Sequence, residues 1–346
     1  MRSRQLPLPP VSELPQFEVR EYRSGDELGI LEAFNRIFAK VDPTFAPRTL
    51  DQWRWQYLEN PSGLRIQLCV TPEGRVLAQY AGLPQRMRIE GAPTFFSQSV
   101  DSLADPEFRR GLAKLPLFVQ AGQAYDHLYG GVGPHKDTLM WGLPVPAAWR
   151  IGKKQLKYEY LRTQNKLVLP ADGLARLGAH GIEIEERADF PPELDAFDLA
   201  FGARYACVAV RDAAQMNWRY ARHPLQRYRI ALARRGGALA GYAVFRKGTF
   251  DGSEDGLLCD WFAPLEDAAV RDALLGWLCR ATLDSGAREL TAVVPDTSDE
   301  WLILQDLGFR VRPTRYFLVG WSFSRQHSLR WLWRHWYYTL GDTDLC

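Results

Sequence analysis

The sequence predicts an α/β protein built from two copies of one fold, each a mixed sheet with helices on both faces. The first observation behind this prediction is an internal repeat, in which Val76–Ala81 (VLAQYA) returns as Ala238–Ala243 (ALAGYA). The echo extends upstream, because Trp55–Tyr57 precedes the first copy and Trp218–Tyr220 precedes the second. Repeats of this length indicate two domains rather than a solenoid, whose units are short and several.

The second observation is that each copy is followed by an apolar run that closes on aspartate and then proline. Asp101 is followed by Pro106 in the first copy, and Asp260 is followed by Pro264 in the second. The third observation is the order of the expected elements, a strand, two helices, a three-stranded meander and a β-α-β crossover in each half. This arrangement predicts a cleft between equivalent halves, and it allows one half to keep a chemistry that the other has lost.

The first half is expected over residues 17–163, after a proline-rich flexible arm at 1–16. Ser24 and Glu27 have the spacing of a capping box, which starts an amphipathic helix after the first strand. Pro116 is tolerated only in the first turn of a helix, so that helix should begin near residue 115. Apolar runs and turn residues place the remaining elements, which are strands at 17–22, 66–70, 76–89, 94–103 and 128–132, an aromatic helix around 53–57, a loop and short helix at 105–124, a helix at 135–142 and a closing segment at 154–161.

The second half is expected over residues 181–323, after a linker at 164–180 that holds a proline, two glycines and few strand formers. Gly236–Gly237 predicts the turn of a hairpin, and Gly286 predicts the end of a long helix with one apolar face. The elements repeat the order of the first half, with strands at 182–186, 228–233, 238–245, 257–262, 290–294 and 316–321, and helices at 191–204, 212–220, 270–281 and 301–307.

Composition argues against several classes of function. A net charge of +2 over 346 residues provides no global field for nucleic acid. The five cysteines are widely spaced without a CxxC pair and the six histidines are scattered, so we expect reduced thiols, no metal site and a cytoplasmic protein. Met1–Arg4 is basic, but prolines follow it where a signal peptide has an apolar core, and no apolar stretch is long enough to span a bilayer.

Several short motifs stand at matching places in the two halves. Leu77–Tyr80 lies in the second strand pair, and Asp105–Arg109 (DPEFR) leads into a loop. Leu307–Phe309 (LGF) ends the last helix, Trp141–Leu143 is its counterpart in the first half, and Tyr337–Asp344 ends in GDTD. Their order and spacing resemble the GNAT acyltransferase superfamily, and more closely the tandem GNAT proteins found among bacterial polysaccharide and cell-envelope genes. The resemblance covers almost the whole chain.

The resemblance implies how an acyl-CoA would be held. In this superfamily two neighbouring strands splay apart, and the backbone of one strand binds the pantetheine arm. A loop and a helix N-terminus then hold the pyrophosphate. The loop at Pro264–Ala268 in the second half has two carboxylates and no glycine, so we expect no cofactor there. The expected contacts of the first half are Val100, Ser102 and Leu103 for the arm, and Arg109, Arg110, Gly111, Leu112, Ala113 and Lys114 for the phosphates.

An N-acyl transfer needs a base for the amine and an acid for the leaving thiolate. The superfamily usually takes the acid from a tyrosine on the helix after the fifth strand, and the predicted helix at 135–142 has no tyrosine. We therefore consider His135 and Tyr129 as acids, and Asp101, Glu107 and His127 as bases. Each also has a structural alternative; Asp101, for example, could cap amides at a strand end.

We expect an N-acyltransferase that moves an acetyl or other acyl group from acyl-CoA to a small-molecule amine. The acceptor that the resemblance implies is an amino-sugar or envelope-glycan precursor. The alternatives are an acyl carrier protein as donor, an aminoacyl-tRNA as donor, and a non-catalytic scaffold. The weak overall charge argues against the tRNA.

Residues 324–346 form a tail in which tryptophans and tyrosines alternate with arginines and histidines. Such a segment can rest on a membrane surface or a partner protein. The alternative is a helix docked across the two halves, which we favour because the aromatics do not keep to one face. Trp53 likewise has two interpretations, as a core residue or as part of an acceptor groove.

Overall fold

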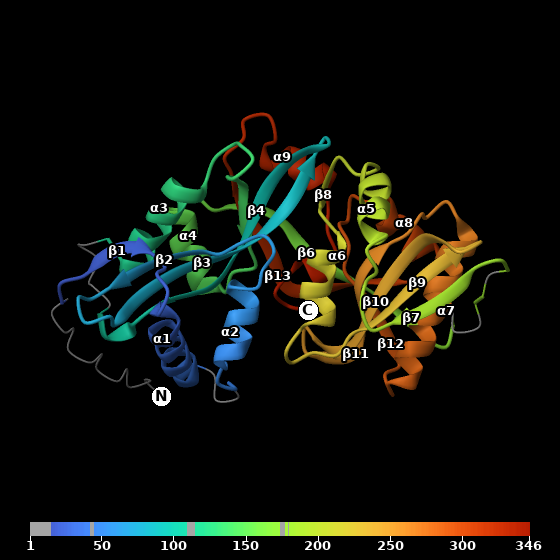
Figure 1. The fold of residues 1–346 in the computed structure, drawn as a ribbon, viewed down its shortest axis with the longest axis horizontal. Coiled ribbons are helices and arrows are strands. Elements are labelled where there is room, and N and C mark those ends of the chain that lie inside the picture. Colours follow the sequence, from blue (N-terminus) through green and yellow to red (C-terminus); the bar gives the residue numbers. More distant parts are fainter. Residues whose placement is uncertain (1–14, 42–44, 109–114, 174–176, 179) are drawn as a thin grey trace, which may run out of the picture.

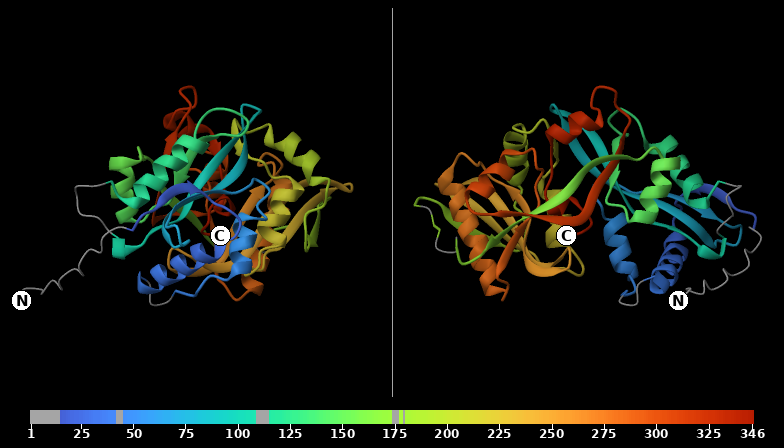
Figure 2. Two further views of the ribbon diagram at one scale, coloured as in Figure 1. Left: turned by 60° about the vertical axis from the view of Figure 1, so that its left-hand side comes forward. Right: turned by 180° about the vertical axis from the view of Figure 1, so that it is seen from behind.

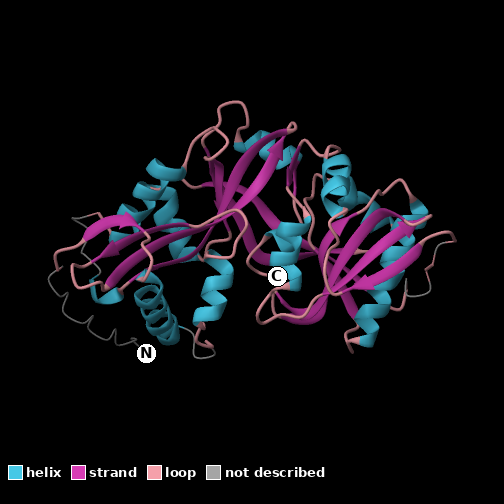
Figure 3. Cartoon of the chain, viewed as in Figure 1, coloured by secondary structure: helices cyan, strands magenta, loops and turns pink. Residues whose placement is uncertain are grey.

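The computed structural model describes residues 15–41, 45–108, 115–173, 177–178 and 180–346. It shows an α/β protein whose two halves share one continuous mixed sheet (Figures 1 and 3). The first half contains, in chain order, β1 (Glu18–Glu21), α1 (Asp26–Val41), α2 (Leu50–Tyr57), β2 (Arg65–Val70), β3 (Val76–Ile89), β4 (Ala92–Ala104), the 3₁₀ turn η1 (Pro106–Phe108), α3 (Leu117–Tyr129), β5 (Asp137–Gly142), α4 (Pro146–Gln155) and β6 (Glu159–Pro170).

The second half repeats this order with small insertions. It contains β7 (Glu183–Arg187), α5 (Leu194–Gly202), β8 (Cys207–Ala209), α6 (Ala213–Met216), the π-helical turn η2 (Asn217–Ala221), β9 (Arg229–Arg235), β10 (Ala238–Phe250), β11 (Ser253–Phe262), α7 (Ala268–Asp284), β12 (Glu289–Ala292), α8 (Asp299–Asp306) and β13 (Arg310–Ser322). After β13 come α9 (Leu329–His335), β14 (Trp336–Tyr337) and the 3₁₀ turn η3 (Leu340–Asp342). Among the described residues, no helix combines the length and apolar character needed to cross a bilayer.

Counted inward from its two edges, the sheet presents equivalent strands of the two halves in the same order. The order is β1-β2-β3-β4-β5-β13-β6-β12-β11-β10-β9-β7. Each strand of the first half therefore has a counterpart, and β4–β5 and β11–β12 are both parallel pairs. The echoed segments Val76–Ala81 and Ala238–Ala243 begin the counterparts β3 and β10. The sequence repeat is thus a pseudo-twofold repeat of the fold.

The two halves exchange a strand at the centre of the sheet. β6, the last strand of the first half, pairs with β12 of the second, where Leu167 lies opposite Ala292. In return β13 pairs with β5, where Val319 lies opposite Gly142. β6 and β13 also pair with each other, and the view from behind shows them together between the halves (Figure 2). Each half therefore needs a strand from the other to complete its sheet.

Alternation along the strands provides a core on each face of the sheet. In β2, Leu68 and Val70 pack in the core beneath α1 and α2, whereas Cys69 packs in the core beneath α3. In β9, Ala231 belongs to the core beneath α7, and its neighbour Ile230 faces the opposite side. Helices therefore cover both faces, as the sequence predicts.

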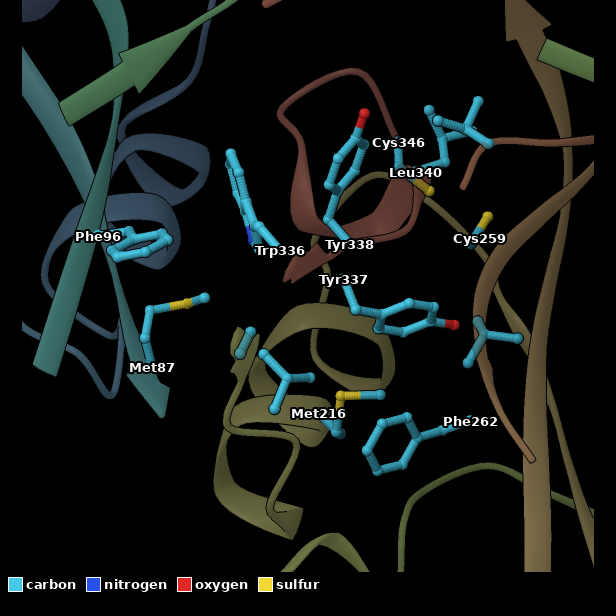
Figure 4. Close-up of a cluster of buried hydrophobic side chains, with 14 of the residues drawn as sticks. Met87, Phe96, Met216, Cys259, Phe262, Trp336, Tyr337, Tyr338, Leu340 and Cys346 are labelled. Carbon is cyan, nitrogen blue, oxygen red and sulfur yellow. The ribbon is translucent and has the colours of Figure 1, made fainter. Parts of the chain in front are cut away.

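A further core lies between the halves and includes the terminal segment (Figure 4). The first half contributes Met87 and Phe96, and the second contributes Met216 and Phe262. Trp336–Tyr338 lie between them, and each of these three side chains is at most 2% exposed. These aromatic residues are part of the protein core.

Two predicted elements near the end of the first half are wrong. The strand predicted at 128–132 does not form, because Tyr125 and Tyr129 continue the packed face of α3, which ends at Gly130. The helix predicted at 135–142 is instead the strand β5. All six residues of β5 are buried, and a short apolar run buried on both faces has no periodicity that separates strand from helix.

The segment predicted as a linker is also different in the structure. Residues 164–170 belong to β6, and Leu167 and Leu169 are buried in the core of the second half. The predicted closing segment at 154–161 combines the end of α4 with the start of β6. Trp53 is a core residue, because it is 2% exposed and contacts the rings of Tyr22 and Tyr57. The predicted arm at 1–16 lies almost entirely outside the described residues.

Candidate active site

The strands β4 and β5 separate part of the way along their length. Parallel pairing runs from Phe95 to Gln98 on β4 and ends at Trp141 on β5. Beyond this point Ser99–Ala104 pairs, within the described part of the chain, with β3 alone. One backbone edge of β4 is therefore free to bind an extended ligand, in the manner expected for a pantetheine arm.

Asp101 lies on this free stretch of β4, where a bulge interrupts the pairing with β3. Its backbone has a φ of 50°, which re-aims the side chain. The carboxylate accepts hydrogen bonds from the Tyr57 hydroxyl at 2.7 Å and from Gln56 Nε2 at 2.9 Å, and it forms an ion pair with Arg48. These contacts hold the carboxylate in one position.

The Asp101 carboxylate lines a cavity of about 250 Å³ between the two halves. Gln98 also lines this cavity, so it lies beside the point at which β4 and β5 separate. The other walls come from α2, β3, η2, β11 and the segment Gly341–Cys346. Arg219 fixes that segment through hydrogen bonds to the carbonyls of Gly341 at 2.9 Å and Thr343 at 2.7 Å.

A second arrangement repeats the first around the pseudo-twofold axis. Arg211 donates to Asp260 at 3.2 Å, and the Tyr220 hydroxyl donates to the same carboxylate at 3.1 Å. We call Arg48, Asp101 and Tyr57 the first Arg–Asp–Tyr group, and their counterparts the second. Asp260 is deeply buried, which raises its pKa although Arg211 acts in the opposite direction. Each arginine stands seven residues before the echoed tryptophan, a signal that the sequence analysis missed.

Tyr158 approaches the separated strands from the opposite face of the sheet. It follows α4, packs in the core beneath α3, and its hydroxyl contacts that of Tyr80. Burial raises the pKa of Tyr158 to about 12, and hydrogen bonding from Tyr80 and Ser99 partly offsets this rise. Ser99 is the first β4 residue beyond the pairing with β5. The sequence did not identify Tyr158, because the helix after the fifth strand was predicted at 135–142, whereas α4 lies at Pro146–Gln155.

The other predicted catalytic residues lie elsewhere. Glu107 is half-exposed and paired with Arg75 at 2.8 Å, whereas His127 and His135 are exposed. The Tyr129 hydroxyl donates to Glu21 at 2.6 Å, and burial raises its pKa. None of these four predicted residues lines the cavity that Asp101 lines, so the structure does not assemble them into one site.

The predicted cofactor contacts divide into two groups. Val100 and Leu103 are buried in the core beneath α1 and α2, with Ser102 half-buried, and all three lie on the free stretch of β4. Arg109, Arg110, Gly111, Leu112, Ala113 and Lys114, expected to hold the phosphates, lie outside the described residues. α3 begins after Pro116, as predicted, and its first turn offers amide groups without partners in the helix. We call the opening between the separated strands β4 and β5 the first wedge. Its described part therefore fits an acyl-CoA arm.

The equivalent wedge of the second half is filled by the terminal segment. β11 and β12 pair only from Gly256 to Leu258, but the Tyr337 hydroxyl donates to the Trp261 carbonyl beyond that point at 2.6 Å. A groove of about 830 Å³ opens beside it, lined by Glu266, Asp299 and Glu300 among others. Arginines line it too, namely Arg204, which pairs with Glu266, and Arg334. No group of His, Cys, Asp and Glu among the described residues could hold a metal ion.

No protein-family model and no curated protein matches this sequence. Solved structures do match. The chain is similar to a probable N-acyltransferase, a conserved protein of unknown function, from Enterococcus faecalis V583, with a TM-score of 0.65 and 12% identity over 89% of this chain and 73% of that one. A GCN5-related N-acetyltransferase from Anabaena variabilis ATCC 29413 gives a TM-score of 0.65 and 13% identity over the same shares. A tandem GNAT protein from the clavulanic acid biosynthesis pathway gives 0.52 and 17% identity, over 89% of this chain and 99% of that one. The chain therefore has the fold of the tandem GNAT proteins.

Proposed function

We propose that the first half transfers an acyl group from acyl-CoA to a small amine held in the cavity between the halves. The observation that carries this proposal is the position of two side chains at the separation of β4 and β5. Asp101 reaches it from the cavity, and Tyr158 reaches it from the opposite face. An acid and a base on opposite sides of one gap are what an acyl transfer requires.

Asp101 has the role of proton acceptor. An alkylammonium with a pKa near 10.4 costs roughly 4–5 kcal/mol to deprotonate at pH 7, at 1.36 kcal/mol per pH unit. A carboxylate fixed by Arg48 and Tyr57 beside the cavity can take that proton, directly or through one water. The same carboxylate also attracts the ammonium form and so increases its local concentration.

Tyr158 has the role of proton donor to the departing thiolate. Because burial keeps its pKa at about 12, the hydroxyl is protonated at neutral pH. Its contact with Tyr80 offers a route for the proton to be replaced. When bound, the thioester supplies the activated acyl group, and the free backbone edge at Ser99–Ala104 would hold its pantetheine arm.

The cavity favours a small acceptor over a large one. Its volume of about 250 Å³ is below the range of roughly 300–1,000 Å³ that is usual for drug-sized ligands. An amino-sugar or a similar envelope-glycan precursor fits this size. We propose a pantetheine thioester ahead of aminoacyl-tRNA as the donor, because the free edge of β4 suits a pantetheine arm and the cavity is too small for a tRNA end. Acyl-CoA is the first donor to test, and acyl carrier protein, which presents the same arm, is the alternative.

The test combines donor binding with amine-dependent release of CoA. Calorimetry should show binding of acetyl-CoA to the wild type and weaker binding to Gly111→Glu, which places a carboxylate in the expected phosphate loop. Asp101→Asn and Tyr158→Phe should each lower kcat about 10²-fold without changing the Kd for acetyl-CoA. Glu107→Gln is the control and should keep wild-type activity. Wild-type protein that binds neither acetyl-CoA nor longer acyl-CoAs contradicts the proposal.

A further inference from the structure

Two aspartates of the terminal segment serve different halves of the molecule. Asp342 accepts a hydrogen bond from Arg211 at 2.6 Å, beside the second Arg–Asp–Tyr group. Asp344 is held by Gln98, whose side-chain amide donates to its carboxylate and accepts from its backbone N–H at 3.1 Å. The segment therefore brings one carboxylate to each group.

The second group has its charges balanced. Arg211 contacts both Asp260 at 3.2 Å and Asp342 at 2.6 Å. Arg219, next to Tyr220 in the sequence, adds a second guanidinium that binds the backbone of the terminal segment. Two cations thus accompany two carboxylates.

Beside the first group, the carboxylate of Asp344 has no arginine hydrogen-bonded to it among the described residues, although Arg219 lines the same cavity. Gln56 occupies the position that Arg219 has in the second half. The first half therefore has one arginine, Arg48, at the two positions where the second half has Arg211 and Arg219. Arg48 is bonded to Asp101, and Asp344 is bonded to an uncharged amide. Asp344 lines the cavity, where burial and nearby Asp101 raise its pKa, whereas the hydrogen bond from Gln98 and the charge of Arg219 act in the opposite direction. A cation placed between the two carboxylates would remove this repulsion.

The same cavity contains polar groups with unused hydrogen-bonding capacity. Arg246 lines it and is only 9% exposed, yet its Nε has no hydrogen-bond partner within the described part of the chain. Gln85 lines it as well, and its Oε1, which is not exposed to solvent, is likewise without a partner there. Buried groups of this kind are costly unless a polar molecule satisfies them. Gln52 and Gln226 also line the cavity, and this polar lining suits a ligand with hydroxyl or similar groups beside its charge.

We propose that Asp344 binds the ammonium group of the acceptor, opposite Asp101, so that the acceptor is a small hydroxylated primary amine that enters as a cation. This inference rests on the proposed function, because the amine bound there is the one that Asp101 deprotonates. The terminal segment then forms part of the acceptor site, and its GDTD sequence supplies one balancing carboxylate and one substrate-binding carboxylate.

The test measures amine binding separately from acyl transfer. Calorimetry at pH 7 with glucosamine, galactosamine and ethanolamine should detect binding of at least one amine to the wild type. N-acetylglucosamine, which has no ammonium group, should not bind. Asp344→Asn should raise the Kd for the amine at least tenfold and leave the Kd for acetyl-CoA unchanged. Glu107→Gln, a matched loss of one carboxylate away from the cavity, should bind the amine as the wild type does.

A second variant guards against a folding defect in the terminal segment. Gln56→Arg introduces the cation that the second half has, and it should abolish amine binding with Asp344 still present. Binding of none of the amines to the wild type, or equal binding to Asp344→Asn and the wild type, overturns the inference. Loss of amine binding in Asp344→Asn without any CoA release by the wild type supports Asp344 and refutes the acyl transfer.

Discussion

Gly152 on α4 determines where the ring of Tyr158 lies. The ring packs directly on this glycine, and a Cβ at position 152 would overlap its carbon atoms. Gly152→Ala gains about 1 kcal/mol of helix propensity but displaces the ring from Tyr80 and Ser99. We expect kcat for CoA release to fall roughly tenfold to a hundredfold, with a shift in Tm of only a few degrees.

The control for this prediction is Tyr158→Phe, which removes the hydroxyl without moving the ring. It should lose activity to a similar extent with an unchanged melting temperature. Full activity in both variants would show that the hydroxyl donates no proton in the reaction.

Asp126, near the C-terminal end of α3, predicts a dependence of stability on pH. Burial raises its pKa from 3.8 to about 7, against the opposing effect of Lys157. The folded state therefore binds more protons than the unfolded state between these values, so this carboxyl reduces stability progressively as the pH rises from about 4 to 7. Asp126→Asn should be more stable than the wild type at pH 8 by roughly 1–3 kcal/mol, and nearly equal to it at pH 4.

Urea denaturation of both proteins at the two pH values measures this difference. A stability difference that does not change with pH would mean that Asp126 is ionised in the folded protein at pH 4, as it is in the unfolded chain.

At the level of elements, α2 and η2 meet through a pair of tryptophans at the pseudo-twofold axis. Trp55 and Trp218 stack with their ring centroids 5.2 Å apart. Each indole N–H donates to the backbone carbonyl of the other tryptophan, at 2.9 and 2.8 Å. Trp55→Phe and Trp218→Phe should each cost about 1–3 kcal/mol, because each leaves a buried carbonyl without its donor.

The double variant tests whether the two bonds act together. Because the rings are in contact, the cycle should give a coupling free energy of at least about 0.5 kcal/mol in urea denaturation. Strict additivity of the two single variants would mean that the halves do not cooperate at this contact.

The strands and helices differ in how well the sequence predicts them. β3 was predicted with its observed bounds, because turn residues flank it and its echo, β10, lies in the same place in the second half. β5 was mistaken for a helix, and this error hid Tyr158 as well, since the expected tyrosine was sought on the wrong segment. Asp101 was one of the predicted bases, although its echo Asp260 favoured a structural role at a strand end. Asp344 was not, because nothing local shows that the terminal segment returns to β4.

At the level of the whole molecule, the exchange of β6 and β13 makes the halves interdependent. Fragments cut between these strands, 1–178 and 179–346, each keep a strand that belongs in the sheet of the other. Neither fragment alone should unfold cooperatively in urea, whereas an equimolar mixture should recover a cooperative transition. Two fragments that each fold alone would contradict the exchange.

This exchange is also the feature of the fold that was not predictable from the sequence. The apolar run Leu167–Leu169 shows that the strand is buried, but the pattern of a buried strand does not say which sheet receives it. The partner is chosen by contacts more than a hundred residues away, such as the pairing of Leu167 with Ala292. The internal repeat predicted two halves of one fold, but it did not predict which strands connect them.

The shared strands restrict how this protein can admit a reactant. In many two-lobed enzymes a hinge lets the lobes swing apart as a clamshell. Here such a swing would break the backbone bonds that tie β13 to β5 and β6 to β12. Entry and exit must then depend on local movements of the segments that line the cavity, among them α2 and Gly341–Cys346. If the proposed function holds, the rate of turnover depends on these local movements rather than on a swing of the two halves.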